Sequence, residues 1–334
     1  MNSTKIVTFD YLRNNSLTHV KVSSAFKQTL KSKIINKYGT LLRFSEEINI
    51  PRETLAHMFN YSKFIKFDKL LKIAKEFDIT YEEIYNEIIS LYARGSNTSK
   101  ELMLSKELLV DEFFVEGYAL YLAEGDNGSN GNTVPRKFRF TNANIGVINH
   151  MIKWIKTYFL NNYFCVNVIN PKGNFIDFEQ VKNLINHDNV KLKEETYNKI
   201  IKYRICFDSA ILIDLILSIE STIKELCSKD PKLAVAYIRG MMIGEGTAYF
   251  NKSRYVRIEM RNEKEIKYLH KLFTMLEYNC KPVLRQNREG HWSLYIGAKQ
   301  LSKFAKEIGF GVHQERQKIL LEASQKILRV NQYC

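Results

Sequence analysis

Two apolar runs with helical periodicity stand out along the chain, at residues 117–125 and 238–246. Each run ends in one glutamate that is followed by glycine. When the runs are aligned on this Glu-Gly pair, small residues coincide at two positions four residues apart, and such positions lie on one helix face. The coinciding residues are Ala119 with Gly240 and Ala123 with Gly244. The pattern predicts two helices that pack closely through this face, because no side chain holds their backbones apart.

Close packing through this face would bring Glu124 and Glu245 side by side at the ends of the two helices. Two adjacent carboxylates repel each other unless a cation lies between them. A carboxylate at a helix C-terminus is also opposed by the helix dipole, so each position calls for a metal ion or another compensating charge. Paired carboxylates suit a divalent metal and phosphate chemistry. The plain alternative is an exposed carboxylate at each helix end.

The pattern that follows each apolar run is the same in both copies. Basic residues alternate with aromatic or aliphatic ones at 136–141 and at 254–261, as in strands with one buried face. A helix is predicted after each of these strands, with Asn144 and Asn262 as its caps. Further strands and a helix complete each copy. The duplication predicts a pseudo-two-fold arrangement about the paired helices.

The two runs together resemble the signature helices of the LAGLIDADG homing endonucleases, and the resemblance covers roughly residues 110–330. In that family each signature helix ends in a metal-binding acid, and single-chain members carry two copies. Both acids are Glu in this chain instead of Asp. The resemblance implies an α+β fold in which an αββαββα unit occurs twice. Its two antiparallel sheets would form a saddle that lies in the DNA major groove.

The resemblance also implies a function, that of a site-specific endonuclease of the homing type acting on double-stranded DNA. Mg²⁺ or Mn²⁺ would be held by Glu124 and Glu245, and the carbonyl groups of Ala123 and Gly244 would complete the coordination. A basic residue beside the attacking water is expected as well. The candidates are Lys202 and Lys299. The alternative function is a DNA-binding transcriptional regulator that has kept the scaffold and lost cleavage.

Basic residues on the predicted strands would lie on the faces turned toward DNA. In the first of these strands Phe138 and Phe140 would face the core, which leaves the basic residues between them outward. As a set these residues favour a phosphate-lined concave surface, although any one of them could equally be a solvated surface charge. The candidates are Lys137, Arg139, Lys202, Arg204, Arg257, Arg261, Arg285 and Arg288.

Residues 23–89 have a helical pattern that is typical of a separate module. Two short helices at 41–48 and 51–59 with a tight joint between them outline a helix-turn-helix. The helix expected at 67–79 resembles the one after the recognition helix in Cro/phage-repressor-type domains. That resemblance implies that the helix from Pro51 enters the major groove, and a protein-interaction module is the alternative. The candidate contacts are Arg52, Glu53, Thr54 and His57.

Only Ala93–Lys100 is typical of a linker, because it is small, polar and without periodicity. We therefore expect four segments along the chain. They are a small all-α helix-turn-helix domain at 1–94, a linker at 95–109, a first LAGLIDADG half at 110–230 and a second half at 231–334.

Composition adds a charge argument to this picture. The 334 residues carry a formal net charge of +14, which points toward a polyanionic partner such as nucleic acid or a membrane surface. The plain alternative, which the charge alone leaves open, is a solvated basic surface. No apolar run approaches the ~20 residues that span a bilayer, and no signal peptide is evident. We expect a cytoplasmic monomer that binds double-stranded DNA, without a membrane or a small-molecule cofactor.

The five cysteines are scattered, without the C-x-x-C spacing of zinc sites. An odd and dispersed set fits a reducing compartment, where thiols pack as small apolar groups. Neither a Ser/His/Asp constellation nor a glycine-rich phosphate loop has a recognisable spacing.

Overall fold

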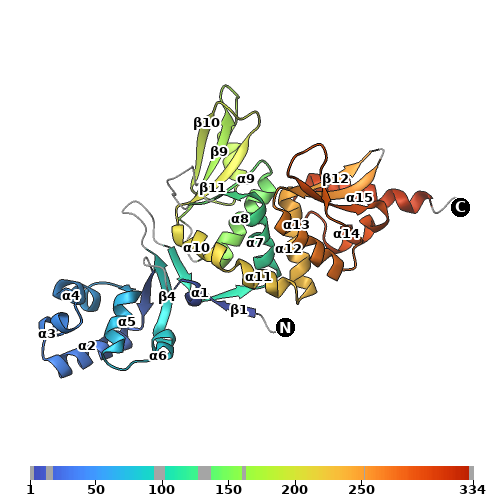
Figure 1. Cartoon of the computed structure of the whole chain (residues 1–334). Helices are drawn as coiled ribbons and strands as arrows, with labels where there is room; N and C mark the ends of the chain where they lie inside the picture. The colour runs from blue at the N-terminus through green and yellow to red at the C-terminus, as the bar shows by residue number, and fades with distance from the viewer. Residues whose placement is uncertain are drawn as a thin grey trace.

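The computed structural model of the protein describes residues 4–12, 18–93, 102–126, 137–159, 163–251 and 253–330. Figure 1 shows a module of short helices at one end, drawn in blue, and a larger body of helices and sheets. The N-terminus lies beside the larger body and not at the tip of the module. Within the described ranges, no helix combines the length and the apolar character needed to cross a bilayer.

The central elements of the body are the two helices that the sequence predicts, α7 (Glu112–Glu124) and α12 (Pro231–Glu245). Each begins at an aspartate, Asp111 or Asp230, whose side chain accepts a backbone N–H from the first turn. The two helices lie side by side in the middle of the body, and each is followed directly by a strand that begins at glycine, Gly125 or Gly246.

Small residues let the backbones of α7 and α12 meet. A Cβ atom added to Gly240 would lie 2.9 Å from the Cβ of Ala119 and would overlap the carbonyl oxygen of Glu116. A Cβ added to Gly244 would lie 2.6 Å from the Cβ of Ala123. Native Cβ atoms do not approach so closely in a packed interior. The contact between the small-residue faces is therefore present, with the residue pairing that the sequence alignment predicts.

The two halves of the body have corresponding elements. After α7 the first half continues with β7 (Gly125–Asp126), β8 (Phe138–Asn142), α8 (Ile145–Tyr158), β9 (Cys165–Pro171), α9 (Phe178–Leu184), β10 (Val190–Glu195), β11 (Lys202–Phe207), α10 (Ala210–Ser218) and α11 (Glu220–Cys227). After α12 the second half continues with β12 (Gly246–Phe250), β13 (Arg254–Met260), α13 (Glu263–Met275), β14 (Val283–Leu284), β15 (Trp292–Gly297), the 3₁₀ helix η1 (Ala298–Gln300), α14 (Leu301–Glu307) and α15 (Gln314–Val330).

The strand order is also shared. Counted from the strand after the central helix, the first sheet runs β7-β8-β11-β9-β10 and the second runs β12-β13-β15-β14. The second sheet is antiparallel throughout. The first carries an additional strand, β10, which pairs in parallel with β9, so the expectation of two purely antiparallel sheets is wrong for this half. The helix α9 lies between these two strands in the chain, and such a crossover connection is what parallel pairing needs.

The N-terminal module differs from the expected all-α domain. Its helices are α2 (Ser24–Tyr38), α3 (Leu41–Glu47), α4 (Arg52–Asn60), α5 (Phe67–Lys75) and α6 (Tyr81–Glu87). It also contains a four-stranded sheet of order β3-β2-β4-β5, formed by β3 (Ile65–Lys66), β2 (Thr18–Val22), β4 (Ile88–Ala93) and β5 (Leu102–Ser105). The expectation of an all-α module was wrong because these strands have only two to six residues, which is too short for a clear periodicity. In addition, β2 pairs with β3 and β4, which lie far from it in the chain.

The segment expected to be a linker is also partly ordered into strands. Residues 94–101 lie outside the described ranges, but 102–105 form β5 and 107–110 form β6 (Glu107–Val110). The strand β6 pairs antiparallel with β1 (Thr4–Val7) at the very start of the chain. Residues 18–105 are therefore inserted between two paired strands of the body.

A short helix joins the inserted module to the body. In α1 (Thr8–Leu12) the buried ring of Phe9 packs edge-on against Phe67 of α5, with 4.5 Å between the ring centroids. The Tyr11 hydroxyl lies 2.6 Å from the Thr222 hydroxyl in α11. The module is thus held to the body by packed side chains as well as by the chain connection.

Candidate active site

Glu124 and Glu245 end the two central helices, and their carboxylates interact. Burial raises the pKa of Glu124 to about 7, and the charge of Glu245 adds to this rise, while Arg316 and Lys202 oppose it. Glu245 keeps more solvent exposure than Glu124, but partial burial still raises its pKa. Carboxylates whose pKa values are raised by burial and by a neighbouring acid, as that of Glu124 is, are typical of functional sites.

Arg316, which the sequence analysis did not single out, supplies a cation at this site. It extends from α15, and its Nη1 donates to the carbonyl oxygens of Ile243 at 2.7 Å and Gly244 at 2.9 Å, with Met242 at 3.4 Å. The carbonyl groups of Ile243 and Gly244 are among those that a helix C-terminus leaves without backbone partners, whereas the Met242 carbonyl also accepts the Gly246 N–H. Burial lowers the pKa of Arg316, and the two glutamates oppose that shift. The compensating charge expected at the helix ends is therefore present for α12 as an arginine.

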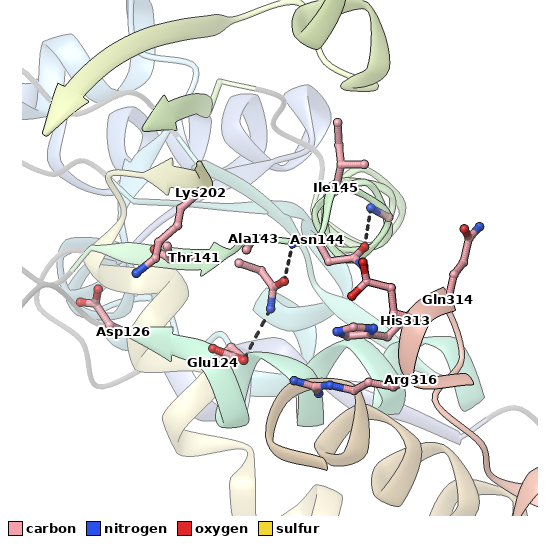
Figure 2. Close-up of a pocket in the computed structure, with 13 residues that line it drawn as sticks. Glu124, Asp126, Thr141, Ala143, Asn144, Ile145, Lys202, His313, Gln314 and Arg316 are labelled. Carbon is pink, nitrogen blue, oxygen red and sulfur yellow. Dashed lines mark hydrogen bonds between the residues drawn. The ribbon is translucent and has the colours of Figure 1, made fainter. Parts of the chain in front are cut away.

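A polar cavity of about 850 Å³ opens beside Glu124. In the view of Figure 2, Glu124 lies between Lys202 on one side and Arg316 on the other. The Nδ2 group of Asn142 donates a long hydrogen bond of 3.5 Å to the Glu124 carboxylate. The cavity lining also includes Asp126, Thr141, Asn144, His313, Gln314 and Glu315.

His313 is a second residue of this cavity that the sequence analysis missed. Its side chain is buried, and its Nδ1 atom makes no hydrogen bond within the described residues. Burial lowers the pKa of His313, with the charge of Arg316 acting in the same direction, so its imidazole is neutral at pH 7. A buried unpartnered ring nitrogen beside a polar cavity is available to a water molecule or another ligand.

The oxygen ligands at this site fit a hard divalent cation. Two carboxylates and the carbonyl groups of Ala123 and Gly244 are the donor types that Mg²⁺ and Mn²⁺ prefer. The Gly244 carbonyl already accepts from Arg316, but a carbonyl oxygen has a second lone pair. In the part of the chain that the structure describes, no group of three or more His, Cys, Asp or Glu could hold a metal. The two glutamates would therefore be the side-chain ligands, and Mg²⁺ ordinarily completes such a sphere with water and phosphate oxygens.

The structure places the two candidate lysines differently. Lys202 lines the cavity, and its charge opposes the rise in the pKa of Glu124 that burial causes. Lys299 is exposed in η1, beyond the end of β15 at Gly297. The strand register places Gly246, which follows Glu245, on the row of Ile258 and Leu294, and Lys299 lies five residues after Leu294 in the chain.

The register of the two sheets indicates which residue of the second half corresponds to Lys202. In the first sheet Ile205 lies on the row of Gly125 and Phe140, and in the second Leu294 lies on the row of Gly246 and Ile258. The residue three positions before Ile205 is Lys202, and the residue three positions before Leu294 is His291. The charges of Arg288 and His291 act to lower the pKa of Glu245. The sequence analysis missed His291 because the strand register is a property of the folded sheet.

The predicted inward and outward positions of the first sheet are confirmed. Phe138 and Phe140 are fully buried, and Arg139 between them is partly exposed. Arg204 lies on the same outward face, where its Nε donates to the Thr141 hydroxyl at 3.1 Å. Lys137 precedes β8 and lies 3.4 Å from the Asp208 carboxylate.

The outward face of the second sheet is organised around one acid. The Glu259 carboxylate lies 2.7 Å from Arg288, 3.3 Å from Arg285 and 3.5 Å from Arg257. Burial acts to raise the pKa of Glu259, but the hydrogen bond from Arg288 and the charges of the other two arginines outweigh it, so the pKa is lowered. The arginines are oriented further by tyrosines, because Arg285 donates to the Tyr295 hydroxyl at 2.7 Å and Arg257 lies over the ring of Tyr249. The remaining candidate, Arg261, is exposed just beyond β13.

In the N-terminal module, α3 and α4 form the expected pair of short helices. The joint contains Asn49 in the left-handed region, with φ of 49°. The helix α4 buries Leu55, Met58 and Phe59. The candidate contacts Arg52, Glu53 and His57 are exposed, and Thr54 is partly exposed.

Comparison with known proteins yields similarity to solved structures only. No family model matches the chain, and no curated protein matches it. The chain is similar to the homing endonuclease I-DmoI in complex with DNA and Mn, at 14% identity over 61% of this chain and 99% of that one, with a TM-score of 0.39. For I-WcaI bound to its DNA recognition sequence the identity is 15%, over 63% and 86% of the two chains, with a TM-score of 0.40. For the N-terminal LAGLIDADG domain of DUF199/WhiA the identity is 16%, over 61% of this chain and 84% of that one, with a TM-score of 0.36. Similarity at this level assigns neither a family nor an activity.

Proposed function

We propose that this protein is a site-specific endonuclease of the homing type that hydrolyses phosphodiester bonds in double-stranded DNA. The observation that carries the proposal is the convergence of Glu124 and Glu245. They end two helices packed through small residues, their charges interact, and Glu124 borders a polar cavity. Paired acids in such a setting suit metal-assisted phosphate chemistry.

The two halves of the body are proposed to be related by a pseudo-two-fold axis between α7 and α12, so that their sheets form a saddle on the DNA. The shared strand order supports this arrangement. Two arginines at matching positions support it as well. Phe140 pairs with the glycine after α7 and Ile258 pairs with the glycine after α12, and Arg139 and Arg257 each lie one position before these residues. The outward basic residues would then neutralise phosphates on both sides of the cleavage position.

Each residue of the site has a role in this proposal. Glu124 and Glu245 would hold Mg²⁺ or Mn²⁺, and the metal would supply Lewis-acid activation of water and of the scissile phosphate. Lys202 stabilises the charged form of Glu124, and His291 does the same for Glu245 in the second half. The neutral His313 can accept a proton from water in the cavity. The carbonyl groups of Ala123 and Gly244 remain candidate ligands.

The N-terminal module is proposed to extend the DNA contact through α4, with Arg52 and Thr54 among its contacting residues. Because the module is inserted between β1 and β6, it can be removed without cutting either strand. A variant in which a short Gly-Ser linker replaces residues 13–105 should retain the folded body. It should bind DNA more weakly and with a shorter footprint. An unchanged footprint and affinity would assign the module to another partner.

A non-cleaving DNA-binding regulator is the second candidate, and Arg316 favours it. The guanidinium donates to the carbonyl groups at the end of α12 and acts against the raised pKa values of both glutamates, so it partly takes the place that a metal ion would have. The two candidates differ in whether the protein cuts the DNA that it binds.

The deciding experiment selects a binding site from randomised double-stranded DNA and then incubates the protein with that site in Mg²⁺, Mn²⁺ or EDTA. Cleavage in metal and none in EDTA supports the endonuclease. Binding without cleavage in either metal supports the regulator. Affinity measured over a range of salt tests the shared premise, because neutralised phosphates release counterions and the log-log slope should be steep. A slope near zero would refute both candidates.

A further inference from the structure

Two cysteines lie directly opposite each other on the first sheet. Cys165 of β9 and Cys206 of β11 are paired in antiparallel register. Directly opposite residues in such a pair have Cα atoms about 4.5–5.5 Å apart, which lies within the range of about 4.4–6.8 Å found across disulfides. Both side chains are partly exposed. The backbone therefore needs no rearrangement for the two sulfur atoms to be joined.

The other described cysteines have a different environment. Cys227 and Cys280 are buried, and burial raises the pKa of each thiol to about 12. Buried thiols of this kind stay protonated and unreactive. The fifth cysteine, Cys334, lies outside the described residues. The contrast singles out Cys165 and Cys206 as the pair that an oxidant in solution can reach.

The surroundings of the pair are cationic. Ile205 and Phe207 are buried, so Cys206 between them lies on the outward face, with Arg139 directly opposite it in β8. The Nδ2 group of Asn167 donates to the Cys206 sulfur at 3.1 Å.

The two thiols are also differentiated from each other. The hydrogen bond from Cys206, together with the charges of Lys191 and Lys193, lowers the pKa of Cys165 to about 6. The pKa of Cys206 is raised by the same hydrogen bond. The pair therefore combines one thiol whose pKa is lowered with one whose pKa is raised, which is the relation between an attacking and a resolving cysteine.

We propose that Cys165 and Cys206 form an oxidant-responsive modification site that closes into a disulfide across the outward face of the first sheet. With hydrogen peroxide as the oxidant, the Cys165 thiolate attacks one oxygen, the O–O bond breaks and Cys165 becomes a sulfenic acid while hydroxide leaves. The Cys206 sulfur then attacks the Cys165 sulfur, and the S–O bond breaks. The departing hydroxide and the Cys206 proton form water. The hydroxide from the first step takes up from solvent the proton that Cys165 had released. In total two thiols are oxidised, and one peroxide is reduced to two waters.

The disulfide would join β9 to β11 covalently and would remove the negative charge that the Cys165 thiolate carries beside Lys191 and Lys193. This inference stands independently of the proposed cleavage activity, since it concerns the chemistry of the sheet alone. Whether the same face contacts DNA is a separate question that the same thiols can answer.

The test counts thiols in the full-length protein. After treatment with hydrogen peroxide at pH 7 the protein is quenched, denatured, labelled with N-ethylmaleimide and weighed by intact-mass spectrometry. Of the five thiols in the chain, two should be lost. A peptide linking Cys165 to Cys206 should appear, and dithiothreitol should restore the lost labels. Before oxidation, Cys165 in the folded protein should be labelled at least about tenfold faster than Cys227 or Cys280.

Matched variants make the outcome decisive. Cys206→Ser should leave Cys165 as a sulfenic acid that dimedone traps, whereas Cys227→Ser should still lose two labels. Five labels remaining after a dose that oxidises glutathione, or a linkage between other cysteines, would overturn the proposal. The labelling is repeated with DNA bound to the protein. Slower modification of Cys165 in this experiment supports a face covered by DNA, and it does not affect the conclusion on the disulfide.

Discussion

Each of the two central helices ends in a glutamate and is followed directly by a paired strand, but the side chains that contact the two helix ends differ. The strand that follows α7 lies in register with Phe140, and the strand that follows α12 lies in register with Ile258. Yet Arg316 donates to three carbonyl groups at the end of α12. At the end of α7, Glu124 accepts a long hydrogen bond from Asn142 and lies near Lys202. One half thus carries its compensating cation within hydrogen-bonding distance of the backbone.

The outward faces of the two sheets differ in the same way. The position after Phe140 in β8 is Thr141, which accepts a hydrogen bond from one arginine. The position after Ile258 in β13 is Glu259, which holds three arginines. The comparison teaches that the two halves share their strand order and register next to the central helices. They differ in the charged side chains that lie on the outward faces of the sheets.

The largest expected effect tests whether the two helix ends act as one site. Glu124→Gln or Glu245→Gln should each reduce cleavage of the selected DNA by about a thousandfold or more, because the amide keeps the shape and loses the charge that a hard cation requires. DNA binding should survive in both variants. Cleavage is measured in single-turnover assays and binding by gel shift. A Gln variant that cuts normally would remove its glutamate from the metal site, and unequal losses would show that the halves have separate roles.

Next in size is the packing that both helices share. Gly240→Ala should lower the free energy of unfolding by about 3 kcal/mol, because its Cβ would overlap the Glu116 carbonyl oxygen. The matched control is Gly297→Ala, where an added Cβ meets nothing within 4 Å. Urea unfolding followed by circular dichroism compares the two variants. Equal stabilities would mean that the helices can separate without cost.

Replacement of Arg316 should abolish the difference between the two helix ends. In EDTA, Arg316→Met should lower the free energy of unfolding by about 1–3 kcal/mol, since it leaves the carbonyl groups of Ile243 and Gly244 without this donor and removes one of the cations that act on the two glutamates. The variant should also bind Mn²⁺ or Ca²⁺ more tightly than the wild type by calorimetry, and either metal should restore stability. Lys318→Met, on an exposed position of the same helix, is the control. Unchanged stability and metal affinity would contradict the role assigned to Arg316.

The smallest effect concerns pH and follows from Glu124 alone. Its pKa is raised from 4.5 to about 7 in the folded protein, so the folded state binds more protons than the unfolded state between these values. The free energy of unfolding of the metal-free protein should therefore fall as pH rises from about 4.5 to 7, by on the order of 2 kcal/mol or less. Glu124→Gln should flatten this part of the profile relative to the wild type. The prediction is contradicted if the free energy of unfolding of the wild type in EDTA rises with pH over this range and Glu124→Gln has the same profile. The pKa of Glu124 would then not be raised in the folded protein.

Local pattern was sufficient for the elements that build the site. The small-residue faces of α7 and α12, the buried Phe138 and Phe140, and the helix caps Asn144 and Asn262 all follow from helical or alternating periodicity and from side-chain capping. These features depend on residues within a few positions of one another, and sequence order contains that information directly.

Tertiary structure alone decided the partners of those elements. Arg316 reaches the end of α12 from the last helix, and His291 is identified only through strand register. The parallel strand β10 and the pairing of β1 with β6 around the inserted module are equally invisible to local pattern. The physical reason is that strand pairing and charge compensation join residues far apart in the chain. The positions of Glu124 and Glu245 in the sequence predicted a compensating charge at the helix ends. Only the folded chain determined that Arg316 supplies it at the end of α12.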